Sequence, residues 1–100
     1  MSSHFLYVIA PKAGIAPCKI GISKDPDRRV KQLQTGFPER LMVHYREPVP
    51  PDRARFYERQ LLREMNHLRT HGEWLDLSVE TAIQIMQWVL IHYADAPVPV

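Results

Sequence analysis

The sequence predicts a small α+β domain, and three observations carry that prediction. The chain has 100 residues, 45% of them hydrophobic and 24% charged, which is the composition of one globular domain. Short apolar segments suited to strands occupy much of the first half, whereas the second half places apolar residues at spacings of three and four. Glycines and prolines separate these segments. We expect residues 1–95 to form a single domain with a helix at its C-terminal end, and residues 96–100 to form a frayed tail.

The first two segments predict neighbouring strands. Residues 4–10 are apolar on both faces, which is typical of a strand in the middle of a sheet. Residues 11–17 contain the turn-forming residues of a hairpin loop. In the second strand, residues 18–22, one face carries Cys18, Ile20 and Ile22, and the other carries Lys19 and Gly21.

A helix follows, with clear signals at both ends. Asp25 is a good N-cap, Pro26 suits the first turn, and Asp27 favours the positive end of the helix dipole. Gly36 ends the helix. Residues 40–47 then predict a third strand, in which Leu41, Val43 and Tyr45 share a face opposite Met42 and His44.

The second half predicts two helices joined by a turn. The first helix runs from about residue 52 to about residue 69, after a rigid break at residues 48–51, and its apolar stripe consists of Ala54, Tyr57, Leu61, Met65 and Leu68. Residues 70–72 form a turn and residues 74–77 a short extended piece. Ser78 caps the last helix, whose inward residues are Ala82, Ile83, Met86, Val89, Leu90 and Tyr93.

Charge is distributed unevenly along the chain. Residues 1–60 hold eleven Lys or Arg and six Asp or Glu, a balance of +5, whereas residues 61–100 hold two and five, a balance of −3. The basic part could face DNA phosphates, and its candidate nucleic-acid-binding residues are Lys12, Lys24, Arg28 and Lys31. A solvated surface with no binding role is the alternative. A single cysteine, the lack of a signal-peptide pattern and the lack of a long apolar run favour a cytoplasmic protein without a membrane segment.

Three charged residues fall at inward positions. Arg29 shares a helical face with apolar residues, Glu58 does the same on the later helix, and Lys19 lies on an interior strand. Buried charge is costly unless it is paired or used. One interpretation is an Arg29–Glu58 salt bridge with Lys19 snorkelling outward. The other is a phosphodiester site, in which Arg29 binds a phosphate, Glu58 holds Mg²⁺, and Tyr7 with Lys19 handles the proton.

The order of six short motifs resembles the GIY-YIG nuclease superfamily, and in particular a phage and bacterial subgroup in which the second tripeptide is Lys-Ile-Gly. The motifs are Leu6-Tyr7-Val8, Lys19-Ile20-Gly21, Asp25-Pro26-x-x-Arg29, Gln32-Leu33-Gln34-Thr35-Gly36, Glu58 and Gly72-Glu73-Trp74-Leu75. The resemblance covers about residues 5–78.

This resemblance implies a three-stranded antiparallel sheet flanked by helices, and an endonuclease that cleaves DNA with Mg²⁺ or Mn²⁺. It implies catalytic roles for Tyr7, Lys19, Arg29 and Glu58. Tyr7 would be the general base, Arg29 would stabilise charge on the phosphate, and Glu58 would be the metal ligand. The alternative is the same fold without catalysis, acting as a nucleic-acid-binding or protein-interaction module.

The remaining notable side chains have simpler interpretations. His67 and His71 have metal-ligand spacing, but a zinc site needs three or four ligands. Cys18 is expected in the core rather than as a nucleophile, and Trp74 in the core rather than stacked on a base. Trp88 and Ile91 fall on the back of the last helix, where they form either a homodimer interface or plain surface.

Overall fold

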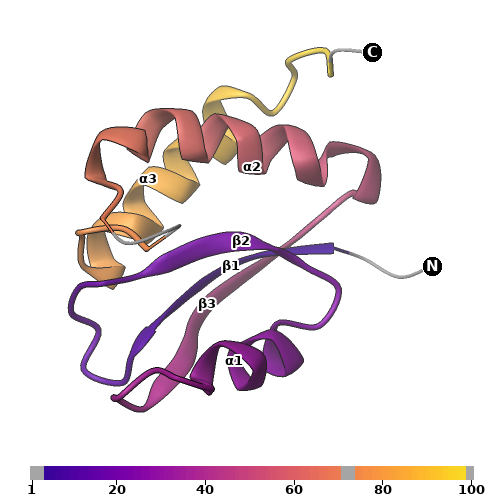
Figure 1. Ribbon diagram of the computed structural model, residues 1–100. Helices are drawn as coiled ribbons and strands as arrows, with labels where there is room; N and C mark the ends of the chain where they lie inside the picture. The colour runs from indigo at the N-terminus through magenta and orange to yellow at the C-terminus, as the bar shows by residue number, and fades with distance from the viewer. Residues whose placement is uncertain (1–3, 71–73, 99–100) are drawn as a thin grey trace.

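The computed structural model describes residues 4–70 and 74–98, and within them the chain forms three strands and three α-helices (Figure 1). In chain order the elements are β1 (His4–Pro11), β2 (Lys19–Ser23), α1 (Pro26–Gln34), β3 (Leu41–Val49), α2 (Pro51–Met65), the 3₁₀ helix η1 (Asn66–Leu68) and α3 (Val79–His92). The predicted α+β class is confirmed. Within the same residues, no helix has the length and apolar character needed to cross a membrane.

The sheet has the order β2-β1-β3, and both pairings are antiparallel. β1 is central, as its two apolar faces predict. Those two faces need two covering layers, because a strand that is apolar on both sides must be shielded from water on both. Figure 1 shows α2 and α3 on one face of the sheet and α1 on the other.

Each face of the sheet has its own hydrophobic core. In the larger core Leu6 and Val8 of β1 meet Leu61 of α2 and Met86 of α3, all four fully buried. The predicted inward stripes of α2 and α3 are thereby confirmed. The smaller core, under α1, is built from Tyr7, Ile9 and Leu41, with Val30, Leu33, Phe37, Val43 and Trp74 packed around them.

β3 reverses its facing at His44, where a β-bulge interrupts the pairing with β1. Before the bulge Val43 packs in the smaller core under α1. After it Tyr45 pairs with Val8 and packs against the larger core. The prediction that Leu41, Val43 and Tyr45 share one face is therefore wrong for Tyr45, since one extra residue moves every later side chain to the other face.

Two predicted boundaries also change. β3 continues through Pro48 to Val49, because an edge strand tolerates a proline where a central strand would lose a ladder hydrogen bond. α2 ends at Met65 rather than near residue 69, and η1 carries Leu68, the last residue of the predicted stripe, against the larger core.

The C-terminal end is held against the domain. The Arg53 guanidinium donates to the carbonyls of Tyr93 and Ala96, each at 2.8 Å. Val98 packs against the larger core. The prediction of a frayed tail is therefore wrong for residues 96–98, which pack against the domain.

Candidate functional site

Tyr7 and Lys19 lie together on the sheet face that α1 covers. Tyr7 of β1 is opposite Gly21 of β2, two residues along from Lys19. Side chains two apart on a strand share a face, so Lys19 and Tyr7 are diagonal neighbours across the two strands. Only 2% of Tyr7 and 5% of Lys19 is exposed. The alternative in which Lys19 snorkels into solvent is therefore wrong.

Gly21 provides the space that the Tyr7 ring occupies. A Cβ atom at position 21 would lie 2.5 Å from the Tyr7 hydroxyl oxygen and 2.8 Å from its Cζ. Any larger residue would push the ring off β2, which is an edge strand. The glycine thus holds the Tyr7 hydroxyl across the strand that borders the sheet.

Arg29 is half-buried and its neighbour Arg28 is exposed, as the helical face predicts. Asp27 and Lys31 point toward β3, since both line the space between α1 and that strand. At about 100° per residue, Arg29 therefore lies on the flank of α1 that faces β2. Its guanidinium donates to Oε1 of Gln32 at 3.3 Å.

Glu58 lies in a different layer. It is half-buried on α2, which packs on the opposite face of the sheet from α1, close to β2. Arg29 donates to Gln32, and its predicted salt bridge with Glu58 stays a prediction. The structure brings Tyr7, Lys19 and Arg29 to one side of the sheet, and Glu58 approaches the same edge strand from the other.

The described residues contain no cluster of three or more His, Cys, Asp or Glu side chains that could hold a metal ion. Glu58 can contribute one carboxylate, and Mg²⁺ typically takes one or two protein carboxylates together with substrate oxygens and water. His67 is exposed, whereas His71 and the Gly72-Glu73 motif lie outside the described residues.

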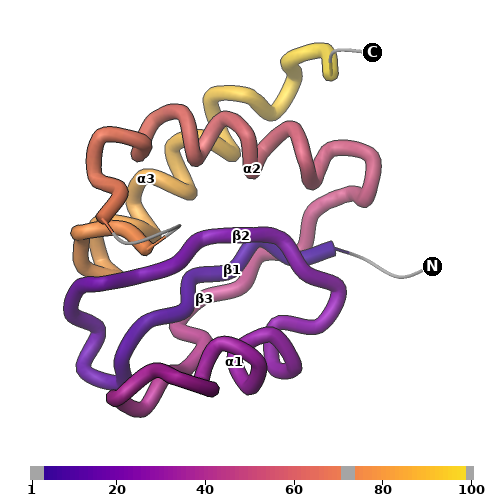
Figure 2. The backbone as a smooth tube through the Cα atoms, viewed as in Figure 1, coloured from indigo at the N-terminus to yellow at the C-terminus, as the bar shows by residue number. Residues whose placement is uncertain are grey.

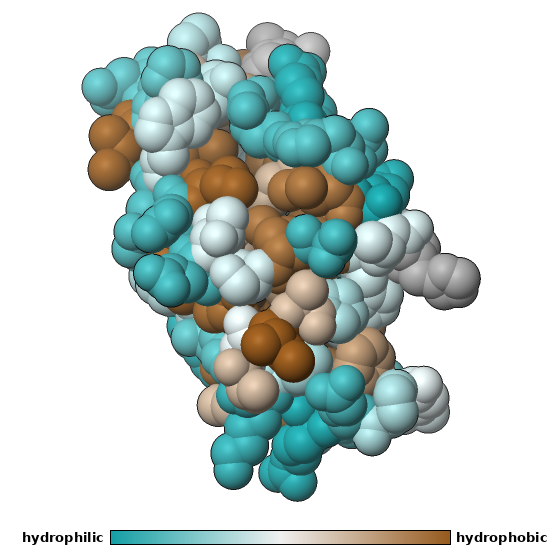
Figure 3. Space-filling view, turned by 90° about the vertical axis from the view of Figure 1, so that its left-hand side faces the viewer, coloured by the Kyte–Doolittle hydropathy of each residue, from teal (hydrophilic) through white to brown (hydrophobic). Residues whose placement is uncertain are grey.

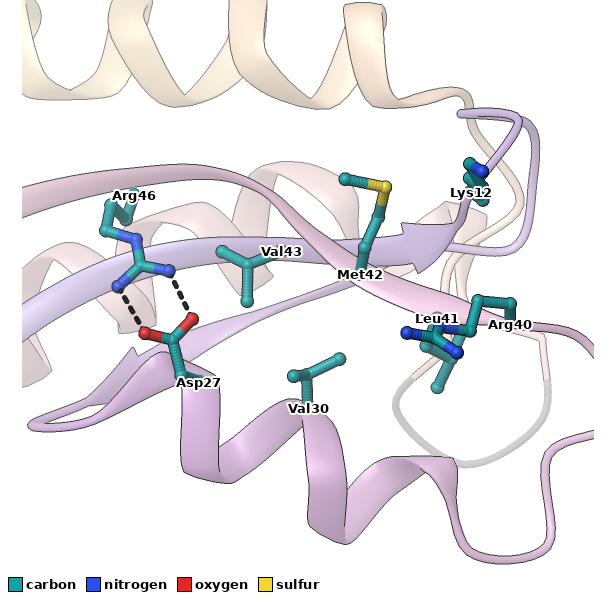
Figure 4. A pocket seen from close by; sticks show the side chains of 8 residues that line it. All are labelled: Lys12, Asp27, Val30, Arg40, Leu41, Met42, Val43 and Arg46. Carbon is teal, nitrogen blue, oxygen red and sulfur yellow. Dashed lines mark hydrogen bonds and ion pairs between the residues drawn. The ribbon is translucent and has the colours of Figure 1, made fainter.

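A second feature, which we call the basic groove, separates α1 from β3 and has a volume of about 790 Å³ (Figure 4). It is lined by Lys12, Asp27, Val30, Arg40, Leu41, Met42, Val43 and Arg46. Lys12 and Arg40 lie at one end. At the other end Arg46 donates two hydrogen bonds, of 2.6 and 3.3 Å, to the carboxylate of Asp27.

The Arg46–Asp27 pair changes the electrostatics of its end of the basic groove. The hydrogen bond from Arg46, reinforced by its charge and by that of Lys31, lowers the pKa of Asp27. The same hydrogen bond raises the pKa of Arg46. Both groups therefore stay ionised near neutral pH and largely neutralise one another. The uncompensated positive charge of the groove lies at the Lys12 and Arg40 end.

The basic groove contains only part of the predicted nucleic-acid-binding set. Lys12 lines it, and Lys31 lines its continuation next to Arg40. Lys24 and Arg28 are exposed but line neither space. Arg40 and Arg46 were missed by the sequence analysis, because an arginine beside or within an exposed edge strand carries no periodic signal.

Gln34 shapes the loop that carries Arg40. Its side-chain amide donates to the carbonyls of Phe37 and Glu39, and its oxygen accepts from the Leu41 amide at 2.8 Å. Gly36 adopts a φ of +83° within this loop, a conformation that favours glycine. The Gln-Thr-Gly motif thus has a structural role, which is to fix the connection between α1 and β3.

Trp74 and Cys18 are structural residues. The Trp74 ring packs on Phe37 with centroids 4.9 Å apart, next to the smaller core. Leu75 forms two backbone hydrogen bonds with Cys18, which extend β2 by one bridge. Burial raises the pKa of the Cys18 thiol to about 12, so the sulfur is a poor nucleophile. Cys18 is buried in the core as predicted, and Trp74 is half-buried against the smaller core.

Comparison with known proteins gives one match. The family model of the T5orf172 domain matches residues 4–90. No curated protein and no solved structure matches the chain.

The match corrects the resemblance drawn from the six motifs, since the matching family is the T5orf172 domain and not the GIY-YIG nuclease superfamily. At a coarse level this family consists of nuclease-like, DNA-binding domains. The match spans nearly the whole described fold, including both flanks of α1. The chain therefore belongs to the T5orf172 domain family.

Proposed function

We propose that this domain is a divalent-metal-dependent endonuclease that cleaves DNA phosphodiester bonds. One observation carries the proposal. A tyrosine hydroxyl, held across an edge strand by Gly21, lies beside a buried lysine on the side of the sheet that Arg29 also faces. A tyrosine hydroxyl, an ammonium and a guanidinium are together suited to deprotonating a nucleophile next to a phosphate.

Tyr7 is the proposed general base. A tyrosine in water has a pKa near about 10, so it needs help to accept a proton at neutral pH. A neighbouring ammonium group favours the phenolate form over the phenol. The diagonal neighbour Lys19 is the proposed source of that charge. Tyr7 would then take the proton from the attacking water.

Arg29 is the proposed phosphate ligand. A guanidinium presents its donors in a planar fork that matches two oxygens of a phosphate. In the described structure its NH1 group is held only by the 3.3 Å bond to Gln32. The remaining donors are available to charge that develops on the phosphate during the reaction.

Glu58 is the proposed ligand for Mg²⁺ or Mn²⁺. Glu58 is half-buried, and a carboxylate is a suitable ligand for a metal that also binds substrate oxygens. When bound, such a metal acts as a Lewis acid on the phosphate and stabilises the leaving oxygen.

The test is plasmid nicking with Mg²⁺ or Mn²⁺ by the wild type and by Tyr7→Phe. The variant keeps the ring that packs in the smaller core but loses the proton acceptor, so we expect the cleavage rate to fall by about 10²–10⁴-fold. A thermal melt provides the control for folding. Unchanged cleavage by a folded Tyr7→Phe variant would exclude Tyr7 as the base.

Glu58→Gln separates metal binding from scaffolding. Loss of the carboxylate should abolish metal-dependent cleavage while DNA binding persists or tightens, because one negative charge is removed. A variant that melts early but cuts normally per folded molecule would instead make Glu58 a structural residue. If neither wild type nor variant cuts although both are folded, the nuclease is excluded and the alternative of a nucleic-acid-binding or protein-interaction module takes its place.

We further propose a homodimer through α3. Trp88 and Ile91 are 50% and 79% exposed, and the Trp88 ring stacks on His92 with centroids 4.5 Å apart. An exposed pair of large apolar residues favours an interface. Sedimentation of the wild type and of Ile91→Glu tests this, and a monomeric wild type would exclude the dimer.

A further inference from the structure

The Lys12 and Arg40 end of the basic groove is a second candidate functional surface. The two residues are far apart in the sequence, yet the Lys12 amide donates to the Arg40 carbonyl at 2.9 Å. Figure 2 shows the β1–β2 loop beside the beginning of β3, which is where the two residues meet. In residues 4–70 and 74–98, no carboxylate forms an ion pair with either cation. Two like charges at the same end of a groove favour an anionic ligand.

The fold holds this arrangement in place before any ligand arrives. Gln34 fixes the backbone on both sides of Arg40 through its bonds to Glu39 and Leu41. Lys31 contributes a third cation from α1, since it lines the continuation of the groove beside Arg40. A ligand therefore meets three cations whose backbones are already positioned, and binding costs little ordering of the chain.

The walls of the basic groove indicate which part of a nucleic acid it fits. Val30 and Val43 lie between its two ends, and none of its lining residues is aromatic. Binding of single strands relies on bases stacked on aromatic rings, and this groove has none to offer. Figure 3 shows that the lower end of the molecule, at the level of α1, is covered largely by hydrophilic residues. Charged residues at both ends and aliphatic residues without rings between them suit a sugar–phosphate backbone.

We propose that the basic groove binds the phosphate backbone of duplex DNA, with Lys12, Arg40 and Lys31 as the phosphate contacts. The inference rests on the proposed function, because it assumes that the domain acts on DNA. It adds a location, since the groove lies on the flank of α1 opposite to Arg29. The DNA would thus be held on the β3 side of α1 and attacked on the β2 side. Substitutions in the basic groove would then weaken DNA binding without removing the residues proposed for cleavage.

The experiment measures affinity by fluorescence anisotropy of a short labelled duplex in EDTA, so that no cleavage occurs, over about 0.05–0.2 M salt. The double variant Lys12→Ala/Arg40→Ala removes two phosphate contacts. We expect its affinity to fall at least about tenfold at the lower salt, and the slope of log K against log salt to decrease by about 1 to 2.

The matched control is Arg59→Ala/Arg63→Ala, which removes the same charge from exposed positions of α2 on the opposite side of the sheet. Its slope should stay close to that of the wild type. Equal losses of DNA affinity in both variants would overturn the proposal that the groove binds DNA, because they would show only an effect of net charge. A loss confined to a single-stranded oligonucleotide of the same length would also overturn it.

The experiments give different results depending on whether the proposed groove binding or the proposed nuclease activity is wrong. If the wild type cuts plasmid and the groove variant binds and cuts as well as the wild type, the nuclease stands and the groove is excluded. If the wild type binds duplex through the groove but does not cut, the groove stands and the nuclease is excluded. A folded wild type that neither binds nor cuts excludes both.

Discussion

The two flanks of α1 carry positive charge in opposite ways. On the β2 side, Lys19 is buried beside Tyr7, and Arg29 is half-buried on the flank of α1. On the β3 side, Lys12 and Arg40 are exposed around an open groove. A desolvated cation has a strong electrostatic interaction with a single neighbouring group. An exposed cation interacts weakly with a phosphate, but the contributions of several such cations to DNA affinity add up. The first environment suits chemistry and the second suits holding a polyanion.

Among the changes that compare the two flanks of α1, the largest expected effect concerns Arg29 on the β2 flank. Arg29→Ala should lower the cleavage rate at saturating DNA by about 10²–10³-fold, because it removes a donor to charge that develops in the transition state. The salt slope of duplex binding should change by less than about 1. Single-turnover kinetics together with anisotropy separate the two quantities. A steep loss of affinity with normal turnover would mean that both flanks only bind DNA.

Gly21→Ala should give the next largest effect. The new Cβ would lie 2.5 Å from the Tyr7 hydroxyl oxygen, so the ring must move or β2 must shift. Overpacking of this kind costs about 1–3 kcal/mol in the free energy of unfolding, measured by urea denaturation. Cleavage per folded molecule should also fall, whereas groove binding should not. A variant as stable and as active as the wild type would show that the close contact does not constrain Tyr7.

The reactivity of the Cys18 thiol reports whether the chain next to Lys19, at the start of β2, is shielded from solvent. Its pKa is raised to about 12 in the folded protein, so the folded state retains the proton at pH values where an unfolded thiol loses it. The contribution to stability is complete below the unfolded pKa of about 9 and is lost as pH rises toward 12. We expect the native thiol to resist alkylation at pH 9 until denaturant is added. Rapid alkylation of the native protein would show that β2 opens to solvent at this end.

The smallest effect is expected at Asp27. Asp27→Asn releases Arg46 from its ion pair and leaves the basic groove more positive. Since both partners are substantially exposed, duplex affinity should rise by at most about fivefold. Because the pKa of Asp27 is lowered, its carboxylate is ionised at neutral pH and the ion pair with Arg46 persists there. The ion pair is lost only as the pH falls through that lowered pKa. Wild-type affinity should therefore not change between about pH 6 and 8 on account of Asp27. Weaker binding by the variant would show that Asp27 helps to position Arg46 for DNA.

Local signals predicted the elements well. Asp25 caps α1 by accepting from the Arg28 amide, and Ser78 caps α3 by accepting from the Thr81 amide, as their residue types indicate. The bulge at His44 was not predictable in this way, because it depends on how β3 pairs with β1 rather than on the residues of β3 alone. Strand periodicity placed Lys19 at a buried position, as expected, whereas Arg29 is half-buried on a flank of α1.

The sequence alone determined the fold class, the central strand and which charges face inward, since periodicity and capping act over a few neighbouring residues. Only the tertiary structure decided which of these residues meet. It placed Glu58 in the layer opposite to Tyr7, and it joined Lys12 to Arg40 across a hydrogen bond between distant segments. The physical reason is that a groove is made by the packing of α1 against β3, and no local pattern records which surfaces two elements leave open when they pack.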